Sequence, residues 1–181
     1  MLVLLLLVSV SCGRGSSESQ LEEEEPTLIE EQKEQLAEKG FIIVYTVEEA
    51  SRLAGYSVAL PEFLPEGFRL HEQILVAQLG LGEWGTRKRH VELMWSWAEG
   101  AHLLLTQVPG TDVLAGREPN EICGRPGARE FFEAGSGREH PLLVLHWQDG
   151  DMGYSLGGSM AGPLTEEILY KIACSVTVGG D

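Results

Sequence analysis

The middle of the chain alternates between apolar and polar residues with a period of two. Successive side chains of a β-strand point to opposite faces, so this pattern predicts half-buried strands over residues 68–76 and 91–97. The apolar positions of these segments are Phe68, Leu70, Ile74, Val76, Val91, Leu93, Trp95 and Trp97. Glu99-Gly100 and Asp149-Gly150 are typical hairpin turns between neighbouring apolar runs. The strands on either side of each turn are therefore predicted to pair antiparallel.

Residues 142–145 form a continuous apolar run, which favours a strand covered on both faces. The predicted cover is a C-terminal helix with Thr165 as its N-cap and two glutamates at the positive end of its dipole. The apolar stripe of this helix consists of Ile168, Leu169, Ile172, Ala173 and Val176. The predicted fold class is α+β: a curved antiparallel sheet packed against the C-terminal helix, with short N-terminal helices.

Two short helices are predicted before the sheet. The first spans residues 27–40. The second begins with a capping box formed by Thr46 and Glu49, and it ends at Gly55, because glycine adopts the left-handed conformation without a Cβ penalty. The predicted single α+β domain spans residues 41–178.

Residues 1–11 are uncharged and largely apolar, and this run stops at Cys12. At about 1.5 Å of rise per residue, a helix over the run is far shorter than a hydrocarbon layer of about 30 Å, so an export signal is favoured over a spanning helix. Ser9-Val10-Ser11-Cys12 resembles the bacterial lipobox, whose cysteine receives diacylglycerol. The prediction is a signal peptide over residues 1–11 and a lipidated Cys12 on the extracytoplasmic side of the bacterial cell envelope. The alternatives are a plain cleaved signal and an uncleaved anchor.

The formal net charge is −15, and glutamates crowd the segment after the expected anchor. Residues 12–26 are predicted to be an acidic disordered spacer, with a calcium-collecting segment as the alternative. The chain has no basic stripe to neutralise phosphates, so no nucleic-acid partner is expected.

No catalytic or metal-binding motif stands out. The five histidines lack the HxH or HExxH spacing that places two imidazoles on one metal ion. The glycine-rich residues 157–162 contain a serine but not the Gly-x-Ser-x-Gly pattern of a nucleophile elbow. We therefore predict no metal, no cofactor, no catalytic residues and a non-enzymatic role.

Two cysteines remain after Cys12. Outside the cytoplasm Cys123 and Cys174 are free to oxidise, and a bridge that encloses about fifty residues stabilises a fold by a few kcal/mol in the chain-entropy model. The alternative is a buried Cys174 on the helix and an independent loop thiol at Cys123. The sequence leaves both alternatives open.

Trp84 lies between glycines, close to the basic triplet Arg87, Lys88 and Arg89. An exposed tryptophan beside cations is a candidate ligand contact, so these four residues form the predicted binding site. The alternative is that the triplet is a solvated hairpin edge, which discourages strand-to-strand aggregation.

The most specific pattern of the folded part is Gly55-Tyr-Ser-Val-Ala-Leu-Pro61-Glu-Phe-Leu-Pro65-Glu-Gly-Phe68. Its prolines fix φ and exclude a helix, and the Glu-Gly pair predicts a turn that leads Phe68 into a strand. The chain resembles a bacterial domain-of-unknown-function family that opens with Gly-aromatic-x-Val-x-x-Pro-x-x-Leu-Pro-Glu-Gly-aromatic. The family closes with a strand and a helix ending in Ala-x-Ser-aliphatic, here residues 173–176.

This resemblance covers about residues 47–176. Members of the family are exported lipoproteins and domains beside the membrane spans of anti-sigma-type regulators, so the resemblance implies ligand sensing or envelope regulation, and it transfers no catalytic residues. At the fold level it extends to periplasmic lipoprotein carriers and sigma-regulator sensor domains. We predict a membrane-tethered, non-catalytic binding or sensor module. Its predicted partners are the membrane, through the lipid anchor, and an envelope protein or lipidic ligand. The alternative function is a carrier of a lipidic or apolar ligand.

Overall fold

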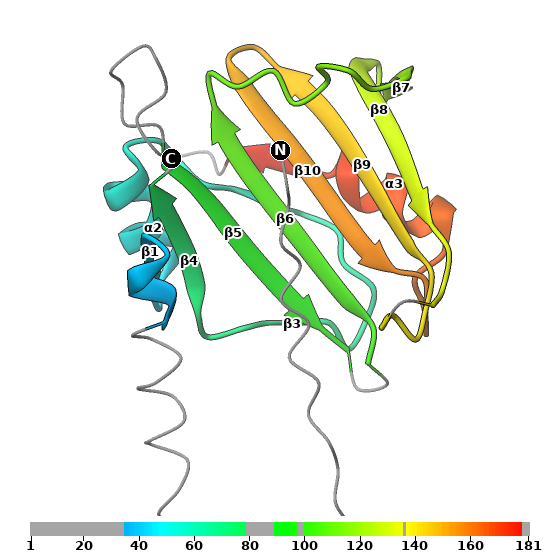
Figure 1. Cartoon of the computed structure of the whole chain (residues 1–181), viewed down its shortest axis with the longest axis horizontal. Coiled ribbons are helices and arrows are strands. Elements are labelled where there is room, and N and C mark those ends of the chain that lie inside the picture. Colours follow the sequence, from blue (N-terminus) through cyan, green and yellow to red (C-terminus); the bar gives the residue numbers. More distant parts are fainter. Residues whose placement is uncertain (1–34, 79–88, 98–99, 136, 179–181) are drawn as a thin grey trace, which may run out of the picture.

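The computed structural model describes residues 35–78, 89–97, 100–135 and 137–178. Its main element is an antiparallel sheet of nine strands. These strands are β1 (Phe41–Val44), β3 (Arg69–Leu70), β4 (Ile74–Gln78), β5 (Arg89–Ser96), β6 (His102–Pro109), β7 (Pro119–Ile122), β8 (Arg125–Phe132), β9 (Leu142–Asp149) and β10 (Met152–Ser159). They follow the order β1-β4-β5-β6-β10-β9-β8-β7, and β3 also pairs with β5 (Figure 1).

The two predicted hairpins are both present. β5 pairs with β6 so that Leu93 lies opposite Leu105, and β9 pairs with β10 so that Leu145 lies opposite Leu156. Residues directly opposite one another share a face of the sheet, so both pairs point into one core. The turns at Glu99-Gly100 and Asp149-Gly150 therefore predicted the pairing of these four strands correctly.

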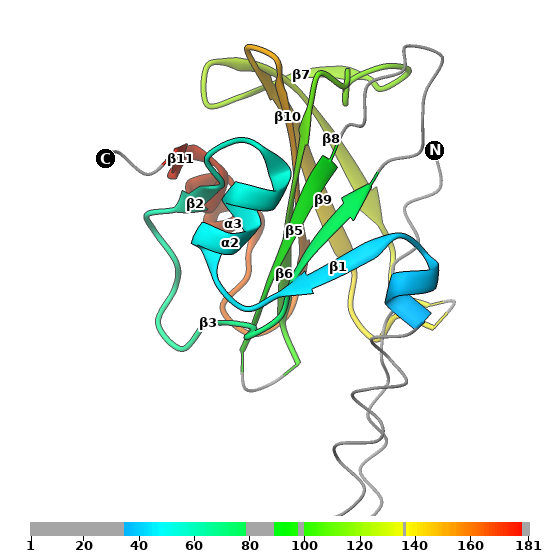
Figure 2. The same ribbon diagram turned by 90° about the vertical axis from the view of Figure 1, so that its left-hand side faces the viewer.

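One face of the sheet is covered by two helices and a second, small sheet. Helix α2 (Val47–Ala54), helix α3 (Glu166–Cys174) and the strand pair β2 (Ala59–Pro61) with β11 (Val176–Val178) lie on the same side of the large sheet (Figure 2). The core between these layers contains fully buried side chains, among them Leu93, Leu103, Leu105, Leu143, Leu145, Leu156, Leu169 and Ile172. Burial stabilises the fold by about 1.5 to 3 kcal/mol for each such side chain.

Both helices begin at the predicted caps. Thr46 Oγ1 accepts a hydrogen bond from the backbone N–H of Glu49 at 3.1 Å, and Thr165 Oγ1 accepts one from Ile168 at 3.2 Å. Helix α2 ends at Gly55, which has the left-handed φ of 84° that the sequence required.

The predicted α+β class is wrong, because the structure is mostly β: 47% of the described residues lie in strands and only 16% in helices. Helices α2 and α3 have 8 and 9 residues, whereas the sheet includes strands that the alternation of apolar and polar residues does not mark. Among them are β7 and β8, where Ile122, Gly127 and Ala128 are the buried residues and most other positions are exposed. The predicted packing of the C-terminal helix against the sheet is present.

The signature segment of residues 55–68 is held to the sheet by the buried Gln107 of β6. Gln107 Nε2 donates to the carbonyl of Ala59 at 2.8 Å, and Gln107 Oε1 accepts from the N–H of Ala59 at 2.8 Å. Tyr56 Oη donates to the backbone carbonyl of Gln107 at 3.0 Å, and burial raises the pKa of Tyr56, which keeps this donor protonated. The Gln107 amide thus takes the place of a neighbouring strand, because it forms hydrogen bonds with both the N–H and the carbonyl of Ala59.

Residues 35–38 are helical and are followed by a turn at Gly40, whose φ is 81°. Three parts of the predictions lie outside the described residues: residues 27–34 of the predicted helix, the predicted acidic spacer at 12–26 and the predicted signal peptide at 1–11. Of the helices in the described part of the chain, none is long and apolar enough to cross a membrane.

Candidate functional site

Of the five residues predicted from the sequence as the lipid anchor and the ligand contacts, the structure describes only Arg89. The other four, Cys12, Trp84, Arg87 and Lys88, lie outside the described residues. Arg89 is the first residue of β5, and its guanidinium donates a hydrogen bond to the backbone carbonyl of Leu53. This carbonyl belongs to the last turn of α2, where a cation complements the helix dipole. Arg89 therefore holds the end of a helix in place.

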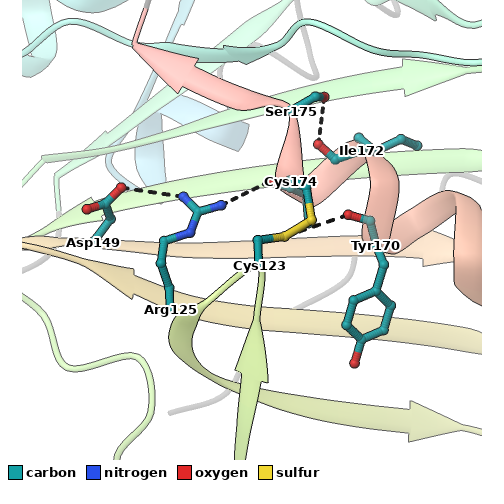
Figure 3. The surroundings of a disulfide bond; sticks show 8 residues. Cys123, Arg125, Asp149, Tyr170, Ile172, Cys174 and Ser175 are labelled. Atoms are coloured by element: carbon teal, nitrogen blue, oxygen red, sulfur yellow. Dashed lines mark hydrogen bonds and ion pairs between the residues drawn. A yellow bond between two sulfur atoms is a disulfide. The ribbon is translucent and has the colours of Figure 1, made fainter.

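A disulfide joins Cys123 to Cys174, with Cα atoms 5.4 Å apart (Figure 3). Of the two alternatives that the sequence left open, the structure has the bridge. Cys123 and Gly124 form the β7–β8 turn with φ values of 57° and 74°, and a type I′ turn requires positive φ at both positions. Cys174 is the last residue of α3. The bridge therefore fastens the edge hairpin of the sheet to the C-terminal helix.

Arg125 adds polar contacts beside the bridge (Figure 3). Its guanidinium lies 3.4 Å from the Asp149 carboxylate, donates to the carbonyl of Ala173 at 3.4 Å and lies 5.4 Å from the ring centroid of Trp147. The Ala173 carbonyl is at the negative end of α3, where a cation is stabilising. The charged groups here are paired with one another, so we assign this region a structural role.

An open hollow lies at one end of the sheet, where the chain turns from the signature segment into β3. It is lined by Gly67, Arg69, Ser96 and Trp97 and has a volume of about 460 Å³. Arg69 lies directly opposite Ser96 in the β3–β5 register, which brings the two side chains to one face. We call these four residues the Trp97 hollow.

The indole ring of Trp97 is fixed between two glycines. A Cβ at Gly67 would lie 2.6 Å from Trp97 Nε1, and a Cβ at Gly162 would lie 2.7 Å from Trp97 Cζ3, both closer than real Cβ contacts. Both glycines have positive φ, 90° and 55°, so a larger residue is disfavoured at each. The period-two pattern placed Trp97 with Trp95 on the apolar side. Trp95 is buried, whereas Trp97 is only partly buried.

The polar side-chain groups of the Trp97 hollow are mainly hydrogen-bond donors. Within the part of the chain that the structure describes, the exposed Arg69 guanidinium has no ion pair or hydrogen bond, and the indole N–H of Trp97 has no acceptor. The Ser96 hydroxyl lies 3.1 Å from His71 Nε2. None of the four lining residues carries a carboxylate.

Two histidines flank the hollow. His102 lies directly opposite Ser96 in the β5–β6 register, and His71 reaches the Ser96 hydroxyl from the other side. Burial lowers the pKa of His102, and the neighbouring His71 lowers it further. Groups that become cationic are therefore crowded together here, although the whole chain has a net charge of −15.

A second polar cluster is centred on the buried His146 of β9. His146 Nδ1 lies 2.8 Å from Ser155 Oγ, and His146 Nε2 lies 3.3 Å from Glu130 Oε2. The other oxygen of Glu130 lies 2.9 Å from Arg117 Nε. Serine, histidine and a carboxylate also occur together in hydrolases, but here the His146 side chain is 5% exposed and both its nitrogens are engaged. We therefore assign this cluster a structural role.

The His146 cluster makes the fold sensitive to acid. Burial lowers the pKa of His146, Arg117 lowers it further, and Glu130 acts in the opposite direction with a smaller effect. The unfolded chain therefore takes up a proton at this histidine below about pH 6.5, while the folded chain resists it, so stability is expected to fall as the pH drops through that value. Urea unfolding measured at pH values on both sides of 6.5 tests this in wild type and in His146→Gln. The expectation fails if the variant loses stability as steeply as wild type.

The described residues hold no group of three or more His, Cys, Asp or Glu side chains placed to bind a metal ion. The chain matches no protein-family model and no curated protein. The family resemblance, which covers about residues 47–176, stays a prediction.

Proposed function

We propose that this protein is a membrane-tethered, extracytoplasmic lipoprotein of the bacterial cell envelope whose folded part is a non-catalytic binding or sensor module. The observation that carries the proposal is the Cys123–Cys174 disulfide, because such bridges form and persist in oxidising compartments outside the cytoplasm. The apolar run before Cys12 supports export to the same place.

The Trp97 hollow supports a role in binding. Its aromatic ring is held in one position by Gly67 and Gly162, and its arginine has no partner among the described residues. Fixed rings and unpaired polar groups in a concave place are the usual features of a ligand site. The charged groups around the disulfide and around His146 are instead paired with one another.

The alternative function, a carrier of a lipidic or apolar ligand, requires a lined cavity between the sheet and α3. In the structure this space is tightly filled. A Cβ at Gly158 of β10 would lie 2.9 Å from Leu169 and 3.4 Å from Leu164, and both leucines are buried. This packing favours the binding module over the carrier.

Membrane attachment is tested by replacing the predicted anchor residue. In a bacterial host fed labelled palmitate, wild type is expected to incorporate label and to sediment with membranes, because acylated cysteine partitions into the bilayer. Cys12→Ser is expected to lose the label and to leave the membrane fraction. A matched control that replaces Cys123 and Cys174 keeps Cys12 and is expected to keep the label. Wild type without label contradicts the lipoprotein assignment.

A further inference from the structure

We propose that the Trp97 hollow binds an oxyanion, a phosphate or carboxylate, carried by a molecule whose flat or apolar part lies against the Trp97 indole. This inference rests on the proposed binding function and names the chemistry of its ligand. It is carried by three observations on the described residues: Arg69 has no ion pair or hydrogen bond among them, the Trp97 indole N–H has no acceptor among them, and none of the four lining residues carries a carboxylate.

Arg69 lacks a counter-charge among the described residues. A guanidinium presents donors in a planar fork that matches the oxygens of phosphate and carboxylate. Three other arginines contact a carboxylate: Arg117 pairs with Glu130, Arg125 with Asp149 and Arg129 with Glu166. Arg89 instead donates to the Leu53 carbonyl, and Arg138 lies over the Phe132 ring. Arg69 has neither an ion pair nor a hydrogen bond within the described residues. An anionic ligand would supply both.

Two histidines lie next to Arg69 and Ser96. His71 contacts the Ser96 hydroxyl, and His102 lies directly opposite Ser96. Burial and the neighbouring His71 lower the pKa of His102, and an anion bound beside Ser96 would act in the opposite direction and favour the protonated imidazole of His102. The Ser96 hydroxyl and the Trp97 indole N–H add neutral donors at the same place.

The hollow has room for a ligand larger than a phosphate group. The hollow, at about 460 Å³, is larger than a phosphate group and lies within the usual range for small-molecule sites. A net charge of −15 disfavours the approach of a free inorganic anion. Contact with a fixed aromatic ring adds apolar attraction, which a phosphate or carboxylate attached to a flat group would gain.

A second hollow of the same protein provides the matched control. It is lined by Glu118, Pro119, Asn120 and Arg129 and has a volume of about 340 Å³. Here the arginine is paired, since Arg129 Nη2 lies 2.8 Å from Glu166 Oε2, and a further carboxylate lines the hollow. Arg129 therefore already has a carboxylate partner, whereas Arg69 has none among the described residues.

Binding is measured on the complete exported chain carrying Cys12→Ser, with phenyl phosphate as the probe and phenol and inorganic phosphate as reference compounds. The indole N–H signal of Trp97, assigned in NMR spectra with Trp97→Phe, is expected to shift with phenyl phosphate, which should bind more tightly than either reference compound. Arg69→Gln is expected to weaken binding about tenfold or more, because hydrogen bonds to charged groups are the strong ones. Arg129→Gln is expected to leave the affinity unchanged.

Vesicles distinguish the two sources of such an anion. Sedimentation of the same protein with phosphatidylglycerol vesicles, but not with phosphatidylcholine vesicles, and its loss in Arg69→Gln, would support the proposal and identify a lipid headgroup. Binding of phenyl phosphate without vesicle binding would support it and identify a soluble ligand. The proposal is overturned if no probe shifts the Trp97 signal, or if Arg69→Gln binds as tightly as wild type. Membrane attachment, measured by label on Cys12, is independent of these outcomes.

Discussion

Loss of the Cys123–Cys174 bridge is expected to lower the free energy of unfolding by about 4 kcal/mol. The two cysteines are separated by 51 positions, so the bridge removes many conformations from the unfolded chain. In the folded protein it also joins the edge hairpin β7–β8 to the end of α3. Without it, this hairpin is held only by the pairing of β8 with β9 and by side-chain contacts.

The variant that isolates the bridge is Cys123→Asn with Cys174→Ala. Asparagine tolerates the positive φ of residue 123 and keeps a favourable Asn-Gly turn, and alanine suits the last position of a helix. Both proteins carry Cys12→Ser, so that the bridge is the only thiol chemistry that differs. Guanidinium unfolding followed by tryptophan fluorescence gives the free energy. Equal midpoints for the two proteins would show that the bridge does not stabilise the fold.

Gln107→Leu is expected to lower the free energy of unfolding by about 2 to 4 kcal/mol, because it leaves two buried backbone groups without partners. Gln107 is fully buried, and its amide serves both the N–H and the carbonyl of Ala59. Leucine has a similar size but cannot form hydrogen bonds. The expected loss of stability therefore comes from the unpaired backbone groups of Ala59 more than from poorer packing.

The matched control is Tyr56→Phe, which removes only the hydrogen bond from Tyr56 Oη to the Gln107 backbone carbonyl. A single neutral hydrogen bond contributes about 0.5 to 1.5 kcal/mol, so this variant should lose clearly less stability than Gln107→Leu. Urea unfolding at neutral pH measures both. If the two variants lose the same amount, the paired contacts with Ala59 are not the main role of Gln107.

The parts of the fold that were predictable from sequence are those where burial leaves apolar runs bounded by turn residues. Strands β5, β6, β9 and β10 lie at the centre of the sheet, and the turn residues between their apolar runs predicted both hairpins. The edge hairpin β7–β8 exposes most of its side chains and turns at Cys123-Gly124, so neither apolar alternation nor a familiar turn pair marked it. That omission led to the wrong fold class.

The site was harder to predict for a different reason. Arg69 and Ser96 are 27 positions apart and meet because β3 pairs with β5, and Gly162 reaches Trp97 from a third segment. Strand register determines which of these residues come close together, and a single sequence does not show the register between distant strands. The clustered triplet of residues 87–89 was conspicuous for the opposite reason, since its members are neighbours along the chain.

The position of β1 determines how the fold responds to tension. β1 is an edge strand, it pairs with β4 alone, and its first pair is Phe41 with Ala77. In a protein held at its N-terminal side, a pulling force enters the folded part at this pair. A force that draws Phe41 away from Ala77 would separate the four pairs of β1 one after another, while the disulfide holds the opposite edge of the sheet. A load in this direction would release a short length of chain before it reached the Trp97 hollow.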